Sequence, residues 1–313
     1  MTTMTGLRPC TRRCPRRSHR RRETPLSTKV FLTLARQQFC CDIGGVFYQP
    51  KNVAEALRLK AELKERGAFI AGGTDIVVLM NHGKAAPENF IDLTHIPELR
   101  AIHRHNGTLE LAGNVTHAQA GELPIRCLAQ AALSVGGPGI RELGTLAGNL
   151  ATASPAGDGS TALLALDAEV ELSSVRGTRR LALEKFFLGY RKTALAADEM
   201  ITKIIVPTNY KSDWAKNGKR GAVNISVVAA AVAITPKNEV RIALASVAPT
   251  PIRCHKAERF LTEKGLSSDS IRQAAEIVRG EIKPITDHRA SADYKVHLSG
   301  VMVRRLLENL TKP

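Results

Sequence analysis

The chain has 313 residues, which is enough for two domains, and 43% of them are hydrophobic, as in a packed protein. The net charge of +16 points at first to nucleic acid, but eight arginines among residues 1–22 supply half of it, with no acidic residue beside them. No apolar run approaches the roughly 20 residues of a membrane-spanning helix, and the six cysteines form no C-x-x-C pair. The sequence therefore disfavours a membrane protein, a zinc site and an iron–sulfur site, and its cysteine usage suits a reducing cytoplasm.

Residues 1–45 differ in composition from the rest of the chain. Their arginine-rich start offers little apolar surface to bury, which predicts disorder. A twin-arginine export signal is disfavoured because the apolar piece that follows, residues 30–35, is short. A nucleic-acid-binding arm stays an alternative. We favour an upstream extension from a misassigned start codon, because the globular pattern begins at residue 46.

From residue 46 onward the sequence predicts a helix and then short strands. Asn52, with Glu55 three positions later, is typical of a helix start, and the apolar spacing carries this helix to near Gly67. The Asn-Gly turn at residues 105–108 predicts a hairpin. Further elements expected in this part are a strand at residues 89–93 and a helix over residues 124–135.

Residues 69–75, the first glycine segment, end an apolar strand in Gly72 and Gly73 and lead into a helix. A strand, a Gly-Gly turn and a helix start leave peptide N–H groups free to face an anion. Thr74 and Asp75 are suited to cap that helix, and capping alone would explain them. The segment matches neither G-x-x-x-x-G-K-[ST] nor G-x-G-x-x-G, which disfavours a Walker ATPase and a Rossmann site.

Residues 144–158, the second glycine segment, contain three glycines, and leucine is their only bulky residue type. They follow neither the period of a strand nor that of a helix. Successive small residues let backbone amides come close to a phosphate, although a glycine-rich surface loop is an equally simple explanation. Two such segments about seventy residues apart suit a ligand with two phosphates.

The rest of the chain mixes strands and helices without regular βαβ alternation, which predicts an α+β fold rather than a doubly wound sheet. The polar segment 208–219 is expected to be the junction between two domains. Near the end of the chain we expect Asp287 to cap the last helix and Arg289 to pair with Asp293. Expected strands span residues 168–172, 199–206, 222–234 and 240–247, and expected helices span residues 161–166, 255–264, 268–279 and 290–310.

Nothing in the sequence indicates a catalytic centre built from the chain's own side chains. Neither H-E-x-x-H nor G-x-S-x-G occurs, and the nine histidines are scattered. His103 and His105 share a strand face, where simple exposure to solvent explains them. We therefore expect no catalytic residues and no metal ligands. A cofactor that carries the chemistry, with the protein supplying binding and orientation, fits better.

Three motifs in this order resemble the FAD-binding (medium) subunit of the molybdenum hydroxylases: A-G-G-T-D at residues 71–75, T-L-A-G-N at residues 145–149 and S-P-A-G-D at residues 154–158. That family includes the flavin subunits of xanthine, nicotinate and aerobic carbon monoxide dehydrogenases. The resemblance implies an α+β fold with a two-subdomain FAD-binding PCMH-type domain over residues 46–215. A smaller α+β domain of the CO-dehydrogenase-flavoprotein C-terminal type, an antiparallel sheet with helices, would cover residues 216–313, after the basic extension of residues 1–45.

The resemblance also implies FAD as the cofactor. The first glycine segment would line its diphosphate and ribityl arm, and the second would close over the diphosphate from the other side. Asp158 matches an acid directed at the adenosine part, Ile201 an apolar contact and Lys216 a lysine near the flavin. A helix cap would equally explain Asp158, and an exposed surface lysine is the simpler explanation of Lys216. Ala147 replaces a glycine common in the family, a tolerable change if its φ is negative. The implied cofactor-binding residues are Ile70, Ala71, Gly72, Gly73, Thr74, Asp75, Thr145, Leu146, Ala147, Gly148, Asn149, Asp158, Ile201 and Lys216.

Finally, the resemblance implies partners. A large molybdopterin-binding subunit would hold the substrate and a small [2Fe–2S] subunit would carry two clusters, in a hetero-oligomer arranged as a dimer of heterotrimers. This chain would be an FAD-dependent oxidoreductase subunit that takes electrons from a cluster and passes them to NAD or another acceptor in the cytoplasm. Two alternatives stay open: a freestanding FAD-dependent oxidoreductase of the same fold, for which no acid or base stands out, and a nucleic-acid-binding protein, which depends on residues 1–22.

Overall fold

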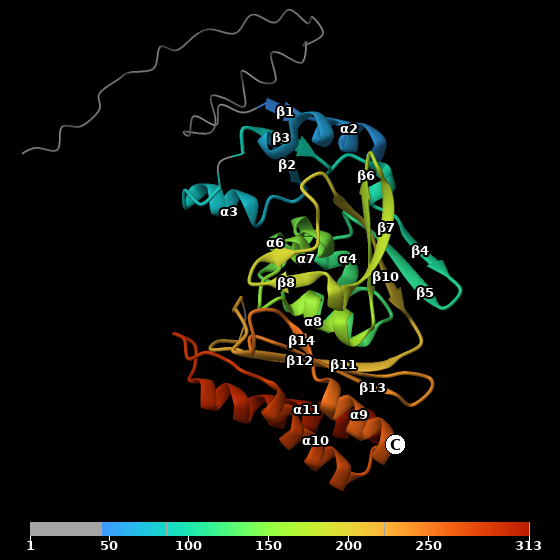
Figure 1. The fold of residues 1–313 in the computed structure, drawn as a ribbon, viewed down its shortest axis with the longest axis vertical. Coiled ribbons are helices and arrows are strands. Elements are labelled where there is room, and N and C mark those ends of the chain that lie inside the picture. Colours follow the sequence, from blue (N-terminus) through green and yellow to red (C-terminus); the bar gives the residue numbers. More distant parts are fainter. Residues whose placement is uncertain (1–45, 86, 222, 313) are drawn as a thin grey trace, which may run out of the picture. The chain divides into compact units, whose positions relative to one another are not determined.

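The computed structural model describes residues 46–85, 87–221 and 223–312, and Figure 1 shows how their helices and strands are arranged. The extension predicted for residues 1–45 lies outside the described residues. The described part mixes a small parallel sheet, antiparallel sheets of five, four and two strands, and helices. The α+β fold that the sequence predicts is therefore confirmed.

The described chain begins with a small parallel sheet covered by one helix. Helix α2 (Val53–Leu63) starts after Asn52, whose side chain accepts a hydrogen bond from the backbone N–H of Glu55 at 2.9 Å, as the sequence predicts. This helix packs against β2 and β3 and buries Leu57 beside Ile91. The strands lie in the order β1-β3-β2 and span Val46–Tyr48, Asn89–Asp92 and Gly67–Ile70.

A five-stranded antiparallel sheet, in the order β4-β5-β10-β6-β7, packs against a layer of short helices (Figure 1). Strands β4 and β5 form the predicted hairpin, and its turn residues Asn106 and Gly107 have φ of 44° and 78°, as a tight hairpin turn requires. Leucines such as Leu111, Leu146 and Leu172 fill the space between this sheet and the helices. In sheet order the strands span Ile102–His105, Thr108–Ala112, Met200–Pro207, Glu169–Ser174 and Gly177–Ala182, and helices α4 to α8 span His117–Gly121, Arg126–Leu133, Pro138–Leu143, Leu146–Thr152 and Asp158–Ala165.

The C-terminal part is a second antiparallel sheet, in the order β11-β12-β13-β14, with α9, α10 and α11 on one face. Successive residues of a strand point to opposite faces. In β12, Val228 and Val232 lie in the core shared with these helices, whereas Ala229 and Ala231 lie in the core shared with α8. The strands span Lys211–Asn217, Val228–Ile234, Val240–Ala245 and Ile252–Arg253, and the helices span His255–Lys264, Ser268–Glu281 and Ala292–Thr311.

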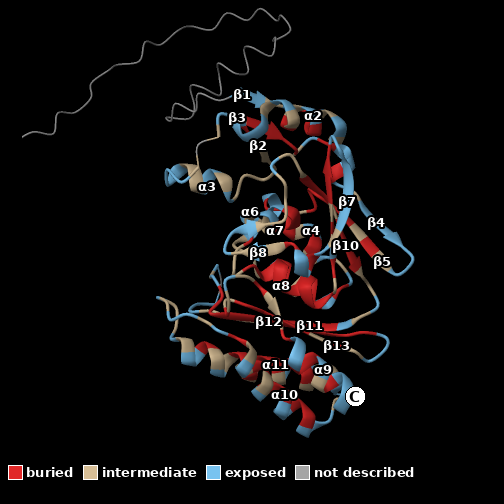
Figure 2. Ribbon diagram, viewed as in Figure 1, coloured by how far each residue is buried: buried red, intermediate tan, exposed pale blue. Residues whose placement is uncertain are grey.

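Helix α8 is buried along its whole length because it lies between two layers, as its red ribbon in Figure 2 shows. It contacts α5 and α7 on the first domain's side and β12, β13 and β14 of the C-terminal sheet. A helix covered on all sides needs no polar face, which explains why its sequence lacks an amphipathic period. Its N-terminus is thereby held between the second glycine segment and the C-terminal sheet.

The segment 208–219, expected to be a polar junction, instead contains strand β11. Ser212 and Asp213 are buried there despite their polarity. Helix α5 provides their partners, since Arg126 pairs with Asp213 at 3.2 Å and the backbone N–H of Cys127 donates to Ser212 at 3.5 Å. The expected boundary between residues 215 and 216 stays a prediction.

Two expectations for the end of the chain were wrong. Ser291, not Asp287, caps α11, because its side chain accepts a hydrogen bond from the backbone N–H of Tyr294 at 3.3 Å. Arg289 pairs with Asp287 at 3.0 Å rather than with Asp293. Short elements complete the described chain: 3-10 helices η1, η2 and η3 span Lys64–Arg66, Pro97–Leu99 and Leu183–Lys185, and the hairpin strands β8 and β9 span Phe187–Gly189 and Lys192–Thr193.

Candidate functional site

The two glycine segments lie against each other. Gly72 is so close to Leu143 that an added Cβ would lie 1.8 Å from the Leu143 carbonyl oxygen. On the other side, a Cβ added to Gly144 would lie 3.2 Å from the hydroxyl oxygen of Thr74. The missing side chains at these two positions are what allows the close approach. Segments about seventy residues apart in the sequence thus form one surface.

The first glycine segment connects β2 to α3 (Ile76–Asn81) and exposes a run of backbone donors. Gly73 has φ of +71°, a left-handed conformation that glycine adopts without strain. The backbone N–H groups of residues 72–75 donate to no acceptor within the described ranges. Ile70 and Ala71, just before them, are half-buried. Successive free N–H groups of this kind favour a bound anion.

Asp75 ties the first glycine segment to the second. It occupies the N-cap position of α3, but its side chain makes no capping hydrogen bond. Its carboxylate instead accepts a hydrogen bond from the hydroxyl group of Thr152, the last residue of α7. The explanation that Asp75 serves only as a helix cap is therefore wrong.

The second glycine segment enters α7 through Thr145, which caps the helix by accepting a hydrogen bond from the backbone N–H of Gly148 at 3.0 Å. The backbone N–H groups of Thr145 and Ala147 have no acceptor among the residues that the structure describes. Ala147 lies inside a right-handed helix, so the methyl group that replaces a glycine causes no strain. The side chain of Leu146 is buried in the core, so only its backbone is near the segment's surface.

Two polar side chains near these backbone donors have unpaired atoms, Asn149 within the second glycine segment and His117 in α4. Asn149 Oδ1 and His117 Nδ1 are buried and have no hydrogen-bond partner in the described part of the chain. Gly159 leaves room for both, since an added Cβ would lie 3.3 Å from Asn149 Oδ1 and 3.8 Å from His117 Cε1. A buried polar atom without a partner is costly, so a ligand or water that supplies one is favoured here.

Sequence reasoning missed His117. The available signal was the capping box of Thr116 and Gln119, which starts α4 and fixes the direction of the residue between them. The side chain is only 2% exposed. Burial first, and the positive charge of Arg141 second, lower the pKa of His117 to about 4. The imidazole is therefore neutral at pH 7 and offers one donor and one acceptor.

Asp158 is the first residue of α8, while Gly157 occupies the N-cap position, so the helix-cap explanation of Asp158 is wrong. Its Oδ2 accepts hydrogen bonds from Lys216 Nζ at 2.6 Å and from the hydroxyl of Ser134 at 3.1 Å. Its Oδ1 is buried with no partner in the ranges that the structure describes. Lys216 is thus a buried ion-pair partner rather than an exposed surface lysine.

Ile201 lies in β10, outside the two glycine segments. It is a buried residue of β10, a strand that packs against α7, and the pairing with β6 is irregular between it and Lys203. The carbonyl of Ile201 also faces Gly113, where an added Cβ would approach within 2.5 Å. These contacts give Ile201 a packing role, and its contact with a cofactor stays a prediction.

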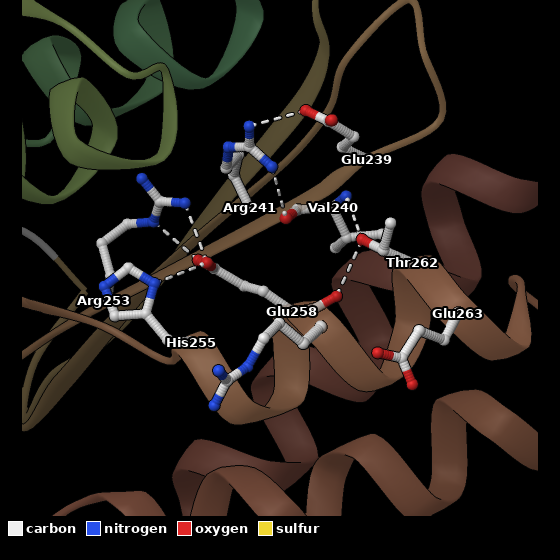
Figure 3. A pocket seen from close by; sticks show the side chains of 9 residues that line it. Glu239, Val240, Arg241, Arg253, His255, Glu258, Thr262 and Glu263 are labelled. Atoms are coloured by element: carbon white, nitrogen blue, oxygen red, sulfur yellow. Dashed lines mark hydrogen bonds and ion pairs between the residues drawn. The ribbon is translucent and has the colours of Figure 1, made fainter.

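A separate cavity of about 560 Å³ lies in the C-terminal part (Figure 3). Four of its charged side chains already pair with one another: Glu258 accepts from Arg253 at 2.6 and 2.8 Å, and Arg241 donates to Glu239 at 2.8 Å. No residue of the glycine segments lines it, so it is not part of the candidate site. The lining residues are Glu239, Val240, Arg241, Arg253, His255, Glu258, Arg259, Thr262 and Glu263.

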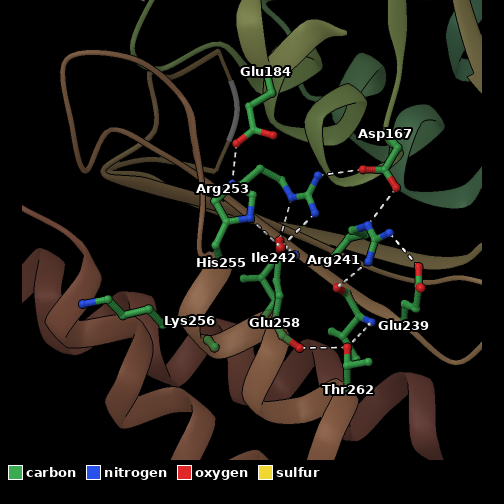
Figure 4. Close-up of polar contacts among 12 residues, drawn as sticks. Asp167, Glu184, Glu239, Arg241, Ile242, Arg253, His255, Lys256, Glu258 and Thr262 are labelled. Carbon is green, nitrogen blue, oxygen red and sulfur yellow. Dashed lines mark hydrogen bonds and ion pairs between the residues drawn. The ribbon is translucent and has the colours of Figure 1, made fainter.

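The arginines of this cavity also hold the C-terminal sheet against the loop after α8 (Figure 4). Asp167 accepts from Arg241 Nε at 2.7 Å and from Arg253 at 2.6 Å. We call Asp167, Arg241, Arg253 and Glu258 the ionic clamp. Charge-assisted hydrogen bonds that are partly shielded from water are stronger than exposed pairs, so the clamp contributes to the contact between the two parts of the molecule.

The groups that line the candidate site are suited to binding a ligand. It offers free backbone donors, a neutral imidazole and a carboxylate oxygen, which suit a ligand with phosphates and hydroxyl groups. Across the described ranges, no group of three or more His, Cys, Asp or Glu residues could hold a metal ion. The described cysteines, Cys127 and Cys254, are buried and free.

Comparison with known families identifies two domains in this chain. The model of the FAD-binding domain in molybdopterin dehydrogenase matches residues 38–209, and that of the CO dehydrogenase flavoprotein C-terminal domain matches residues 215–310. The chain belongs to the FAD-binding medium subunits of the molybdenum hydroxylase family. It is an FAD-dependent oxidoreductase subunit whose cofactor is FAD, and the predicted two-domain fold is confirmed.

Individual relatives align with most of this chain and with most of their own length. The nicotinate dehydrogenase FAD-subunit of Eubacterium barkeri is 34% identical over 80% of this chain and 90% of its own length. The carbon monoxide dehydrogenase medium chain of Hydrogenophaga pseudoflava is 31% identical over 83% of this chain and 95% of its own length. A solved structure of carbon monoxide dehydrogenase from Hydrogenophaga pseudoflava superposes with a TM-score of 0.79, covering 84% of this chain and 96% of that one at 30% identity.

Within the described residues, no helix has the length and apolar character needed to cross a membrane.

Proposed function

We propose that the two glycine segments hold the diphosphate of FAD between them. The observation that carries this proposal is the contact of Gly72 with Leu143, which brings the free N–H groups of residues 72–75 beside those of Thr145 and Ala147. Phosphate oxygens would accept from these donors. The proposed cofactor-binding set is the one expected from the sequence, Ile70 to Asp75, Thr145 to Asn149, Asp158, Ile201 and Lys216, with His117 added.

The polar atoms around the diphosphate site fit the rest of the cofactor. Asp158 Oδ1 is free to accept a hydrogen bond from a ribose hydroxyl, and Asn149 and the neutral His117 both lie close to Gly159 in the first turn of α8. Bound FAD supplies one-electron and two-electron chemistry, and the chain supplies binding, orientation and exclusion of water. A protein-built nucleophile or base is not needed for this role.

We further propose that the chain works inside a hetero-oligomer in the cytoplasm, with a molybdopterin-binding large subunit and a [2Fe–2S] small subunit. Electrons would pass from a cluster of the small subunit through this chain to NAD or another acceptor. The names of the relatives support this proposal, since they are subunits or medium chains of dehydrogenases. The dimer of heterotrimers is the corresponding proposal for stoichiometry.

The binding proposal is tested by Gly72→Ala in the full chain. The new methyl group would collide with the Leu143 carbonyl and force the glycine segments apart, so FAD affinity should fall on the order of tenfold or more, equivalent to about 1.4 kcal/mol. Fluorescence titration of FAD measures it, with circular dichroism to confirm folding. Gly280→Ala is the matched control, because an added Cβ there meets no atom within 4 Å. Wild-type protein that takes up no FAD, or a Gly72→Ala variant with unchanged affinity, would refute the proposal.

The partner proposal is tested by isolating the chain from its native cell under mild conditions and identifying the proteins and cofactors that accompany it. Recovery with a molybdopterin protein and an iron–sulfur protein supports the hetero-oligomer. Recovery of a yellow protein alone, active without partners, supports the freestanding oxidoreductase instead. The nucleic-acid alternative depends on residues 1–22, which lie outside the described residues.

A further inference from the structure

Asp158 and Lys216 form a buried ion pair between two parts of the molecule. Asp158 starts α8 of the first domain, and Lys216 lies in β11 of the C-terminal sheet. Their charged atoms, Lys216 Nζ and Asp158 Oδ2, are 2.6 Å apart, and their side chains are only 10% and 7% exposed. The pair therefore does not resemble the exposed salt bridges that contribute little to stability.

The pair fixes the orientation of the Asp158 carboxylate. Oδ2 also accepts from the hydroxyl of Ser134, and Lys216 Nζ donates a second hydrogen bond to the backbone carbonyl of Ser134 at 3.3 Å. Ser134 itself is held by its backbone N–H, which donates to the carbonyl groups of Gln130 and Ala131 in α5, each at 3.2 Å. With Oδ2 engaged in this way, Oδ1 is the oxygen left without a partner among the described residues.

Burial disfavours the negative charge of Asp158, and the positive charge of Lys216 favours it. Desolvation is the largest effect and raises the pKa of Asp158 above its ordinary value, and the charge and hydrogen bond of Lys216 and the hydrogen bond of Ser134 limit that rise. Within the described part of the chain, Lys216 is the charged group that acts on this carboxylate. Without Lys216, Asp158 would take up a proton at a higher pH and lose acceptor strength at Oδ1.

We propose that Lys216 is a positioning residue: its ion pair with Oδ2 holds the Asp158 carboxylate so that Oδ1 can accept a hydrogen bond from FAD. The proposal rests on the proposed function of Asp158 as an FAD ligand. The C-terminal domain then completes a binding site that the first domain only begins. Lys216 belongs to the proposed cofactor-binding set through its contact with Asp158, in place of the contact with the flavin that the sequence implies.

The test is a double-mutant cycle on FAD affinity in the full chain, measured by fluorescence titration between pH 5 and pH 9. We expect Lys216→Met to weaken binding on the order of tenfold at pH 7, because the buried carboxylate loses its counter-charge. The acid limb of the affinity profile should move to higher pH by about one unit or more, since a close opposite charge lowers a carboxyl pKa by about 1–3 units. Lys216→Arg should restore part of the affinity.

The second arm uses Asp158→Asn alone and together with Lys216→Met. We expect the double variant to bind FAD about as well as Asp158→Asn, without the acid limb, because Lys216 has nothing to orient once the carboxylate is gone. The double variant removes both charges of the pair and so leaves no buried unpaired charge. It therefore tests the proposal even where Lys216→Met alone does not fold. Arg126→Met is the matched control: it removes another pair between α5 and β11, that with Asp213, and should leave the pH profile unchanged.

The outcomes separate the two proposals. Wild-type protein that does not bind FAD refutes the proposed function. Wild-type binding with a Lys216→Met profile that keeps its affinity and its acid limb refutes the positioning role alone. If Lys216→Met and Asp158→Asn each lower FAD affinity equally at all pH values, and their effects add in the double variant, Lys216 contacts FAD directly. That outcome also refutes the positioning role.

Discussion

At the scale of single residues, the sequence predicted roles that depend on neighbouring residues, such as helix caps. It did not predict burial or contacts between residues far apart in the chain. Asn52 caps its helix as expected, and the glycines at positions 72 and 144 permit the close approach that their small size indicated. His117 and Lys216 were not recognised as buried, because burial depends on what the fold brings near them. Lys216 and Asp158 are 58 positions apart, a separation that no local pattern encodes.

The buried imidazole of His117 makes a testable contribution at this scale. Its pKa is lowered to about 4 in the folded chain from 6.5, so the unfolded state binds the proton more readily. Stability from this residue is complete above pH 6.5 and is lost as the pH falls from about 6.5 towards 4. Between pH 7.5 and pH 5 the loss amounts to about 2 kcal/mol.

The measurement is urea unfolding of the wild type and His117→Asn at both pH values. The variant should be less stable at pH 7.5 but should lose about 2 kcal/mol less on acidification. His95→Gln, at an exposed position, should lose as much as the wild type. Equal pH sensitivity in His117→Asn and the wild type would show that the imidazole is not held neutral.

At the scale of elements, the spacing of apolar residues predicted the long helices correctly. It did not predict a strand whose buried polar groups find partners in another element. The expected helices near residues 255–264 and 268–279 agree closely with α9 and α10. Strand β11 was missed because its sequence is polar, yet α5 pairs its charge and hydroxyl group. A polar strand is stable when a neighbouring helix satisfies its buried groups, and that neighbour is invisible in the strand's own sequence.

The ionic clamp gives the prediction for this scale. Asp167→Asn removes the charge that Arg241 and Arg253 share, and we expect a loss of about 1–3 kcal/mol in the free energy of unfolding. Asparagine tolerates the left-handed φ of +50° at this position, so backbone strain does not contribute. Asp269→Asn removes an exposed pair with Arg272 and should change stability by less than about 1 kcal/mol. Comparable losses in both variants would contradict a role for the clamp.

At the scale of the whole molecule, the C-terminal sheet links the two domains because both of its faces are covered. Most alanines of β12 and β13 belong to the same core as α8, while Ala230 and the valine, isoleucine and leucine side chains such as Val232 and Ile242 belong to the core of α9, α10 and α11. The sequence predicted two domains but could not indicate this sharing, since an apolar strand of alternating small and large residues does not reveal what covers each face.

A shared core predicts that the two domains unfold together. Trp214, the single tryptophan, lies in β11 and its backbone N–H donates to Gln130 of α5 at 3.1 Å, so its fluorescence reports on the contact between domains. We expect its urea midpoint to coincide with that of far-ultraviolet circular dichroism, which reports on all helices and strands.

Ala231→Leu overpacks the face towards α8 and should lower both midpoints together, through a loss of about 1–3 kcal/mol in the free energy of unfolding. Ala182→Leu, at an exposed position of β7, should leave them in place. Two separate midpoints in the wild type would show that the domains unfold independently, and the C-terminal sheet could then detach while the first domain stays folded.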